Sequence, residues 1–203
     1  MHRAAIGDEL VVGLAGGKIG RGIVRNDAIE MTIVLDQDPP APLDIALVLA
    51  LPRPKVMNRV IAAVASLGIK RLFLINSWRV DKSYWKTPRL SPDNIRQQAI
   101  LGLEQARDTI LPQIELRRLF RPFVEEELPA IAQGTTGLVA HPYASEECPR
   151  NVAGPVTMAI GPEGGFIAQE IESLVRAGLR PVSLGPRILR VETAVATIAG
   201  RLA

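Results

Sequence analysis

The sequence predicts an α/β fold, in which helices cover a parallel sheet, preceded by a small β unit. From residue 43 onward, short apolar segments alternate with helical segments, which is the pattern of parallel crossovers. Gly68 and Gly178 follow two of the helical segments, at the position where glycine commonly ends a helix. Residues 1–38 instead contain short segments rich in β-branched residues, separated by turn signals.

The first unit is expected to contain three strands. The pattern places them at Glu9–Gly13, Lys18–Arg25 and Ile29–Leu35, with turns at Gly16-Gly17 and Asn26-Asp27. So short a unit buries little core by itself, so we expect it to lean on the rest of the chain or to be a truncated barrel. The stretch Asp38-Pro39-Pro40-Ala41-Pro42 continues neither a strand nor a helix and is expected to form a stiff linker.

The second unit, residues 43–203, is expected to form the α/β sheet. Its strands are predicted at Leu43–Leu51, Lys70–Ile75, Ile114–Phe120, Gly137–Ala140, Val156–Ile160 and Pro181–Leu184. Its helices are predicted at Lys55–Leu67, from an N-cap at Ser91 to Thr109, and at Val124–Ala132, Ile167–Ala177 and Glu192–Leu202. Helices between parallel strands place the ends of several strands at one edge of the sheet.

Composition excludes several classes of protein. Of the 203 residues, 47% are hydrophobic and 22% charged, which is a globular balance. The longest apolar run, Ile45–Leu51, is too short to span a membrane. The first eight residues lack the apolar core of a signal peptide. A single cysteine and two histidines exclude a disulfide framework and disfavour a metal site. We therefore expect a cytoplasmic protein without a metal.

The charge changes sign along the chain. Residues 1–46 hold four basic and seven acidic residues, and the remainder holds 20 basic and 14 acidic residues. A basic second unit suits a polyanion, although an unevenly charged solvated surface explains the same counts.

Three strand ends carry the glycine and polar residues that a ligand site needs. The segments are L-V-A-H-P at 138–142, A-I-G-P-E-G-G-F at 159–166 and S-L-G-P-R-I-L-R-V-E-T-A at 183–194. Ligands of open α/β sheets lie beyond the carboxyl ends of the strands, so we expect these segments to share one pocket. Singly, each is also explained as a tight turn, and His141 as a turn histidine bonded to a neighbouring carbonyl. Neither the dinucleotide fingerprint nor a Walker A loop is present.

In combination, the second and third segments resemble the signature of the bacterial 16S ribosomal RNA (uracil-N3)-methyltransferases. The resemblance extends upstream to P-P-A-P-L at 39–43, L-A-L-P-R-P-K at 49–55, L-G-I-K-R at 67–71 and E-Q-A-R at 104–107. This family belongs to the SPOUT class, whose C-terminal chain forms a trefoil knot. The resemblance implies that residues 43–203 are a SPOUT methyltransferase domain, and that residues 1–38 correspond to a small PUA-like RNA-binding β-barrel, shorter here than in the family.

The resemblance also implies S-adenosyl-L-methionine as the methyl donor. We expect backbone groups and apolar side chains of the three segments to hold it, because such a site suits an adenine ring and a ribose. The residues expected around it are Leu138, His141, Ile160, Gly161, Glu163, Gly164, Leu184, Gly185, Ile188, Leu189 and Arg190.

Methylation at N3 of uracil requires loss of a proton, and the negative charge then spreads onto the flanking carbonyl oxygens. An arginine stabilises such charge. Arg190 is the first candidate and Arg187 the second. A carboxylate accepts the proton. Glu163 and Glu192 are candidates for this role. Each is also explained as a helix-capping residue, and for Glu192 capping is the favoured interpretation.

RNA is expected to bind the basic, aromatic segment at 78–86. Cations hold phosphates and aromatic rings stack on bases, although the same rings can pack on the core or on a second subunit. The residues expected to contact RNA, besides Trp78, are Arg79, Lys82, Tyr84, Trp85 and Lys86.

The resemblance further implies a homodimer that acts on 16S ribosomal RNA or on the small ribosomal subunit. The apolar side of Glu192–Leu202 suits burial against a partner, although burial within the subunit is equally consistent. Two alternatives remain at this level: a knotted methyltransferase for another RNA, such as one acting on a tRNA ribose 2′-oxygen, and a non-catalytic RNA-binding protein.

Overall fold

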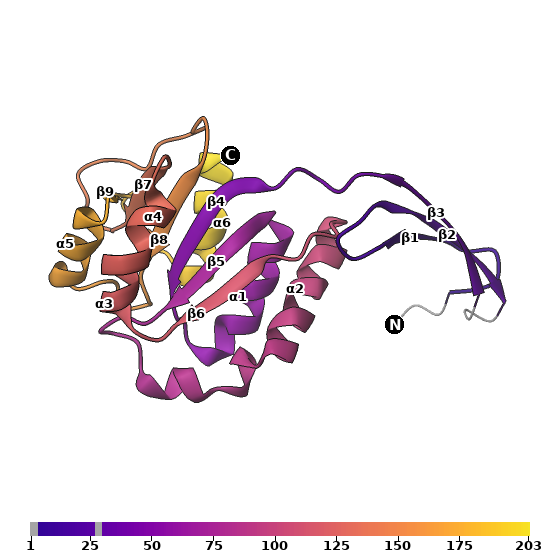
Figure 1. Cartoon of the computed structure of the whole chain (residues 1–203), viewed down its shortest axis with the longest axis horizontal. Helices are drawn as coiled ribbons and strands as arrows, with labels where there is room; N and C mark the ends of the chain where they lie inside the picture. Colours follow the sequence, from indigo (N-terminus) through magenta and orange to yellow (C-terminus); the bar gives the residue numbers. More distant parts are fainter. Residues whose placement is uncertain (1–3, 27–29) are drawn as a thin grey trace.

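The N-terminal unit is a three-stranded antiparallel sheet. The computed structural model describes residues 4–26 and 30–203, and Figure 1 shows this sheet projecting from the body of the molecule. Strands β1 (Glu9–Gly13) and β3 (Glu30–Gln37) flank β2 (Ile19–Asn26). The three expected strands are thus present. The predicted turn residue Asp27 and the predicted strand start Ile29 lie outside the described residues.

The body of the molecule is a six-stranded sheet in which every pairing is parallel. Its strand order is β6-β5-β4-β8-β7-β9. The strands are β4 (Leu43–Ala50), β5 (Ile69–Ile75), β6 (Gln113–Arg117), β7 (Thr136–Ala140), β8 (Val156–Ile160) and β9 (Arg180–Val182). The central strands β4 and β8 are almost wholly buried, which agrees with their continuous apolar sequences. This arrangement confirms the predicted α/β class.

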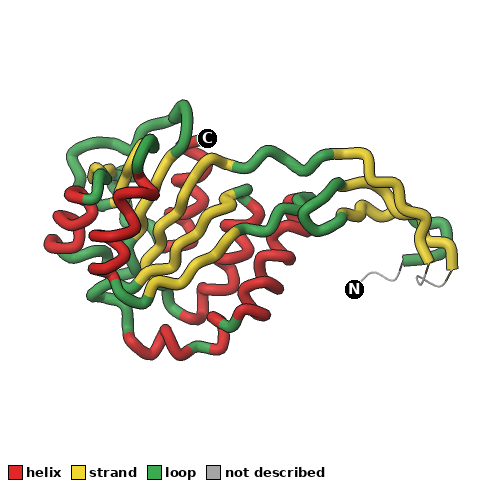
Figure 2. The backbone as a smooth tube through the Cα atoms, viewed as in Figure 1, coloured by secondary structure: helices red, strands yellow, loops and turns green. Residues whose placement is uncertain are grey.

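Helices cover both faces of this sheet, as Figures 1 and 2 show. Helix α1 (Pro54–Ser66) packs against α2 (Pro92–Ala106) and α6 (Val191–Leu202) on one face. The other face carries α5 (Ala168–Arg176) and a helical segment made of α3 (Phe120–Pro122), a π-helical turn (Phe123–Glu127) and α4 (Leu128–Ala132). None of the helices in the described part of the chain is long and apolar enough to cross a membrane.

Local sequence explains most helix ends. Ser91 caps α2 by accepting a hydrogen bond from the Asn94 N–H at 3.3 Å. The helix stops at Ala106, before the predicted end at Thr109, because Arg107 adopts a left-handed conformation with φ of 51°. Gly68 and Gly178 have φ of 77° and 101°, as expected of residues that end helices. Two short 3-10 turns, Lys82–Lys86 and Pro88–Leu90, were not predicted.

Two connections join the N-terminal sheet to the body. The proline-rich stretch at 38–42 leads from β3 into β4 without regular structure, as predicted. The β1–β2 turn is clasped by Thr109, whose carbonyl accepts from the Gly16 N–H at 2.8 Å and whose hydroxyl donates to the Gly17 carbonyl at 2.5 Å. Beside it, the ammonium of Lys70 lies 2.5 Å from the buried carboxylate of Asp108. The sheet is therefore held at two separate points.

Candidate functional site

The three predicted segments converge on one cavity. Strands β8, β7 and β9 are neighbours and parallel, so their carboxyl ends lie at the same edge of the sheet. The segments that follow them enclose a cavity of about 260 Å³. Its lining consists of residues from these segments and from the loop after β5: Arg79, Ala140, His141, Pro142, Tyr143, Ile160, Gly161, Pro162, Glu163, Gly164, Gly165, Leu184, Gly185, Arg187, Ile188, Leu189, Val191 and Ala194.

Most residues predicted to surround a cofactor line this cavity. The two exceptions are Leu138 and Arg190. Leu138 is fully buried inside β7, where it pairs with Met158 of β8, so it belongs to the core beneath the cavity. Arg190 is exposed at the N-cap of α6. The other nine residues line the cavity, and their contact with a cofactor stays a prediction.

The G-P-E-G-G loop is a tight turn that favours glycine at Gly165 through its backbone conformation and at Gly161 through close backbone packing. The Gly165 N–H donates to the Pro162 carbonyl at 2.7 Å, and Gly165 has φ of 72°. A Cβ atom on Gly161 would lie only 2.9 Å from the backbone nitrogen of Phe166. The absence of side chains at these positions leaves the backbone facing the cavity, as expected of a loop that binds a ligand through its main chain.

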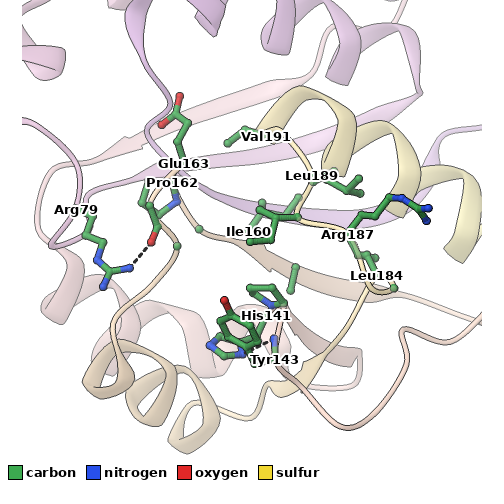
Figure 3. A pocket seen from close by; sticks show the side chains of 18 residues that line it. Arg79, His141, Tyr143, Ile160, Pro162, Glu163, Leu184, Arg187, Leu189 and Val191 are labelled. Carbon is green, nitrogen blue, oxygen red and sulfur yellow. Dashed lines mark hydrogen bonds between the residues drawn. The ribbon is translucent and has the colours of Figure 1, made fainter.

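Glu163 is engaged by the start of α1. Its Oε1 accepts a hydrogen bond from the Arg53 N–H at 3.1 Å and lies 3.9 Å from the Arg53 Nε. Figure 3 shows the Glu163 carboxylate directed away from His141 and Tyr143. The other carboxylate considered, Glu192, lies in the first turn of α6, 3.6 Å from a guanidinium nitrogen of Arg59. Glu163 thus links the G-P-E-G-G loop to the start of α1, and Glu192 links helix α6 to α1.

His141 and Tyr143 form the opposite side of the cavity in Figure 3. The His141 ring nitrogen Nδ1 accepts from the Tyr143 N–H at 3.3 Å, and the two rings meet edge to face at 6.0 Å between centroids. The expected partner of the histidine ring was a carbonyl, whereas the actual partner is an N–H. Tyr143 is 81% exposed, and it was not predicted to line the cavity.

The third segment closes the cavity with a turn whose backbone conformation favours glycine. Gly185 has φ of 114°, and its N–H donates to the Ser183 hydroxyl at 3.2 Å. The Ile188 side chain is 73% exposed, although it lines the cavity. When a ligand covers an exposed apolar side chain at a cavity mouth, apolar surface is removed from water, which favours binding. In Figure 3 the guanidinium of Arg187 extends away from the cavity.

The basic segment at 78–86 differs from its prediction at one residue. Trp85 is buried and donates its indole N–H to Asn76 Oδ1 at 3.0 Å, and the Arg118 guanidinium lies 5.7 Å from its ring. The ring is thus part of the core, and the prediction that it contacts RNA is wrong for this conformation. Tyr84 is half-buried against the same core. Trp78 is instead 80% exposed.

The cations of this segment remain at the surface. Arg79, Lys82 and Lys86 are all exposed. Between them, Asp81 caps the 3-10 turn, and its pKa is lowered because its carboxylate accepts hydrogen bonds from the Ser83 N–H and hydroxyl. Arg79, predicted only as an RNA contact, also lines the cavity and donates a hydrogen bond to the Gly164 carbonyl.

Sequence reasoning missed one buried carboxylate beside the site. Glu170, in the first turn of α5, is only 6% exposed and accepts the Ile167 N–H at 3.0 Å. A glutamate three residues after a helix start is the usual signal of such a cap, but Ile167 lacks the hydroxyl that completes the pattern. Among the described residues, no cluster of histidine, cysteine, aspartate or glutamate has the geometry of a metal site.

Helix α6 buries its apolar side within the chain. Val195, Ile198 and Leu202 are at most 3% exposed, and the helix packs against α1 and β8. The alternative of burial within the subunit therefore accounts for this apolar side.

The fold and the cavity define an α/β protein with a ligand site built on loops after parallel strands. The model of a family described as an RNA methyltransferase domain matches residues 39–203. The chain therefore belongs to the RNA methyltransferase domain family, which confirms the family resemblance of its motifs.

Similar proteins support this assignment. The chain is 26% identical to ribosomal RNA small subunit methyltransferase E of Mycobacterium bovis, over 98% of this chain and 79% of that protein. A solved methyltransferase of Legionella pneumophila with bound S-adenosylmethionine is 26% identical, with a TM-score of 0.77 over 97% of this chain and 83% of that chain. The fold also matches ribosomal RNA small subunit methyltransferase E of Neisseria gonorrhoeae, with a TM-score of 0.77 at 24% identity over 97% of this chain and 83% of that chain.

Proposed function

We propose that this protein transfers a methyl group from S-adenosyl-L-methionine to N3 of a uridine in 16S ribosomal RNA. The observation that carries the proposal is the convergence of the three loops on one cavity in a chain of the RNA methyltransferase domain family. The names of the relatives support ribosomal RNA of the small subunit as the substrate. The signature from Leu184 to Ala194 supports uracil N3 as the acceptor, through its resemblance to that family.

The cavity fits the methyl donor. Its volume of about 260 Å³ lies just below the ~300–1,000 Å³ typical of ligand pockets. Ile160, Leu184 and Leu189 offer apolar walls for an adenine ring, and the glycine-rich turns offer backbone groups for its polar edge and for the ribose. When bound, the donor supplies an activated methyl group, so the protein supplies position and electrostatics.

The arginines beside the cavity are proposed to stabilise the negative charge that uracil acquires when N3 loses its proton. Arg187 lines the cavity, and Arg190 follows the cavity residues Ile188 and Leu189. Both side chains are exposed, and an RNA that covers the cavity would bring the base toward them. Arg190 is the first candidate, although it does not line the cavity, because catalytic hydrogen bonds that are long in an unliganded enzyme shorten when substrate binds.

Glu163 is proposed to anchor the G-P-E-G-G loop to α1. Its hydrogen bond from Arg53 and the direction of its carboxylate favour this role over proton transfer. Its role as the proton acceptor stays a prediction, which a glutamine substitution tests.

RNA is proposed to bind along the exposed cations Arg79, Lys82 and Lys86 and to stack on the exposed ring of Trp78.

The sheet of residues 1–38 is proposed to be part of a PUA-like RNA-binding unit, and residues 43–203 a SPOUT domain with a C-terminal trefoil knot. A homodimer in the cytoplasm is the proposed assembly. These three proposals depend on the family resemblance.

The proposed reaction is tested by mapping methylated uridines in ribosomal RNA from cells that lack this protein. We expect one N3-methyluridine of 16S ribosomal RNA to disappear and to be restored by purified protein with S-adenosylmethionine. Naked RNA and intact small subunits are compared as substrates in the same assay. Loss of a tRNA ribose methylation, with 16S ribosomal RNA unchanged, would instead identify the alternative reaction.

A further inference from the structure

Glu170 is a buried carboxylate that joins two surface segments. Its Oε1 accepts the Trp78 N–H at 2.8 Å, and its Oε2 accepts the Ile167 N–H at 3.0 Å and lies 3.4 Å from the Ser77 hydroxyl. Ile167 ends the loop that begins at Gly161, whereas Ser77 and Trp78 follow β5. One side chain thus holds the backbone of the cavity loop and the backbone of the aromatic, basic segment.

The segment held by Glu170 is a tight turn with buried ends and an exposed tip. The Val80 N–H donates to the Ser77 carbonyl at 3.0 Å, and both residues are buried. Between them, Trp78 and Arg79 are exposed. The turn therefore presents an indole ring and a guanidinium at the surface, while its backbone donates one hydrogen bond to Glu170.

A second contact links the tip of this turn to the cavity. Arg79 donates to the Gly164 carbonyl, as Figure 3 shows, and a Cβ atom on Gly164 would lie 3.0 Å from Arg79 Cδ. The turn is consequently attached to the cavity loop on both sides of Trp78, through Glu170 below and through Arg79 above. A displacement of Trp78 would be transmitted to the loop from Gly161 to Ile167.

We propose that Glu170 is a positioning residue that couples RNA binding at Trp78 to binding of the methyl donor in the cavity. The inference depends on the proposed function. A ligand on either segment orders the backbone that both ligands use, so the second ligand pays less for that ordering. Coupling of this kind is reciprocal: RNA raises the affinity for the donor by the same factor by which the donor raises the affinity for RNA.

The coupling is measured by calorimetry with S-adenosylhomocysteine, which has no methyl group to transfer, and a 16S ribosomal RNA transcript. In the unmodified protein, saturating RNA is expected to tighten binding of S-adenosylhomocysteine about fivefold or more. In Glu170→Gln that factor is expected to fall to about twofold or less, because an amide accepts from only one of the two N–H groups and its NH₂ opposes the other, whereas the contact of Arg79 with Gly164 remains. The control Glu172→Gln, at an exposed position of the same helix, is expected to keep the coupling.

The outcomes separate this inference from the proposed function. If S-adenosylhomocysteine does not bind at all, the proposed function fails. If both ligands bind but independently in the unmodified protein, the coupling is disproved without any variant. If Glu170→Gln lowers the melting temperature yet keeps the coupling factor at a temperature where it is folded, Glu170 is only a structural residue and the proposal is overturned.

A spectroscopic measurement tests the same link without RNA. The chain has two tryptophans, so Trp85→Phe leaves Trp78 as the only indole. In that protein, S-adenosylhomocysteine is expected to reduce acrylamide quenching of Trp78, because ordering of the cavity loop restrains the turn. The response is expected to vanish when Glu170→Gln is added. Quenching that the ligand leaves unchanged in Trp85→Phe, or changes equally in both proteins, contradicts the proposal.

Discussion

The side chain of Glu163 and the backbone of Arg53 are joined by a 3.1 Å hydrogen bond that ties the cavity loop to the N-cap of α1. The Arg53 guanidinium is 66% exposed, and its nitrogen lies farther away, at 3.9 Å, so the N–H contact defines the link. A carboxylate so engaged fixes the loop in place. The sequence alone leaves open a helix-capping role and a proton-accepting role for Glu163, and this contact instead favours a loop anchor over a proton acceptor.

Replacement of Glu163 by glutamine distinguishes these two roles. The amide oxygen still accepts from the Arg53 N–H, so we expect single-turnover methyl transfer within about tenfold of the unmodified rate. Loss of a general base would instead lower the rate by about 10²–10⁴. Glu163→Ala serves as the comparison, because it removes the anchor as well and is expected to weaken cofactor binding. A glutamine variant that binds cofactor normally and transfers no methyl group would make Glu163 the proton acceptor.

The two arginines of the third segment are compared by alanine substitution. We expect Arg190→Ala to keep cofactor affinity within about tenfold while methyl transfer falls by about 10²–10³, the usual loss when one donor to a developing oxyanion is removed. Arg187→Ala is the matched variant, three residues earlier in the same loop, and is expected to have the smaller effect. Cofactor affinity is measured by calorimetry and transfer with radiolabelled donor. Unchanged turnover of Arg190→Ala would remove that residue from the mechanism.

The two tryptophans are expected to respond differently to substitution. Trp78→Ala removes an exposed ring, so RNA affinity should fall by about 1–3 kcal/mol with little change in melting temperature. Trp85→Ala removes a buried ring and should destabilise the fold by about 3–5 kcal/mol. Filter binding and thermal unfolding measure the two effects.

Salt gives an independent test of the RNA surface. Cations that contact phosphates make binding weaken steeply between ~50 and 200 mM salt, and each lost contact reduces the slope by about one. We expect Lys82→Ala and Lys86→Ala each to reduce that slope. An RNA affinity that stays flat over this range would disprove phosphate contact by this segment.

Two helical glycines form a matched pair for stability. A Cβ atom on Gly102 of α2 would lie 2.2 Å from the Ala62 carbonyl oxygen of α1, whereas Gly200 of α6 has open space around that position. Gly102→Ala is therefore expected to destabilise the protein by about 1–3 kcal/mol through overpacking of the α1–α2 contact. Gly200→Ala is expected to stabilise it by about 0.5–1 kcal/mol. Equal unfolding free energies for the two variants would contradict the close packing of these helices.

Cys148 gives a pH dependence of defined sign. Its thiol is buried, and this burial raises its pKa above the ordinary value of 9.0, although Arg201 and Arg180 act in the opposite direction. The folded state therefore binds the proton more tightly than the unfolded state does. The stabilisation is complete below about pH 9 and is lost as the pH rises through the folded-state pKa. As the pH rises above about 9, the unfolding free energy should therefore fall less steeply in Cys148→Ala than in the unmodified protein, as urea titrations at several pH values would measure.

Much of the fold was predictable because its signals are local. The apolar run Leu43–Ala50, the cap at Ser91 and the glycines at 68 and 178 each specify their element through nearest neighbours. The end of α2 was missed because Arg107 adopts a left-handed conformation without being glycine. The two 3-10 turns after β5 were missed because the packing of Trp85 on the core, which sequence periodicity does not reveal, holds that loop in place.

The cavity lining was predictable for the residues that directly follow the parallel strands. Parallel strands bring their carboxyl ends to one edge, so loops far apart in sequence meet without any contact being known beforehand. Residues contributed by other elements were not predictable in this way. Arg79 reaches the cavity from the loop after β5, and Tyr143 reaches it from a turn after β7. The role of Glu170 depends on three partners that only the folded chain brings together.

The N-terminal sheet is attached to the body both by the hydrogen bonds of Thr109 and by the proline-rich stretch at 38–42. A single tether would let the N-terminal sheet swing freely, whereas attachment at both the β1–β2 turn and the β3–β4 connection fixes its bearing with respect to the cavity. The sheet and the cavity thus lie at a defined distance and orientation from one another in this structure. A substrate that contacts both the N-terminal sheet and the cavity must present two binding features at a matching spacing, so its binding depends on its shape as well as on its sequence.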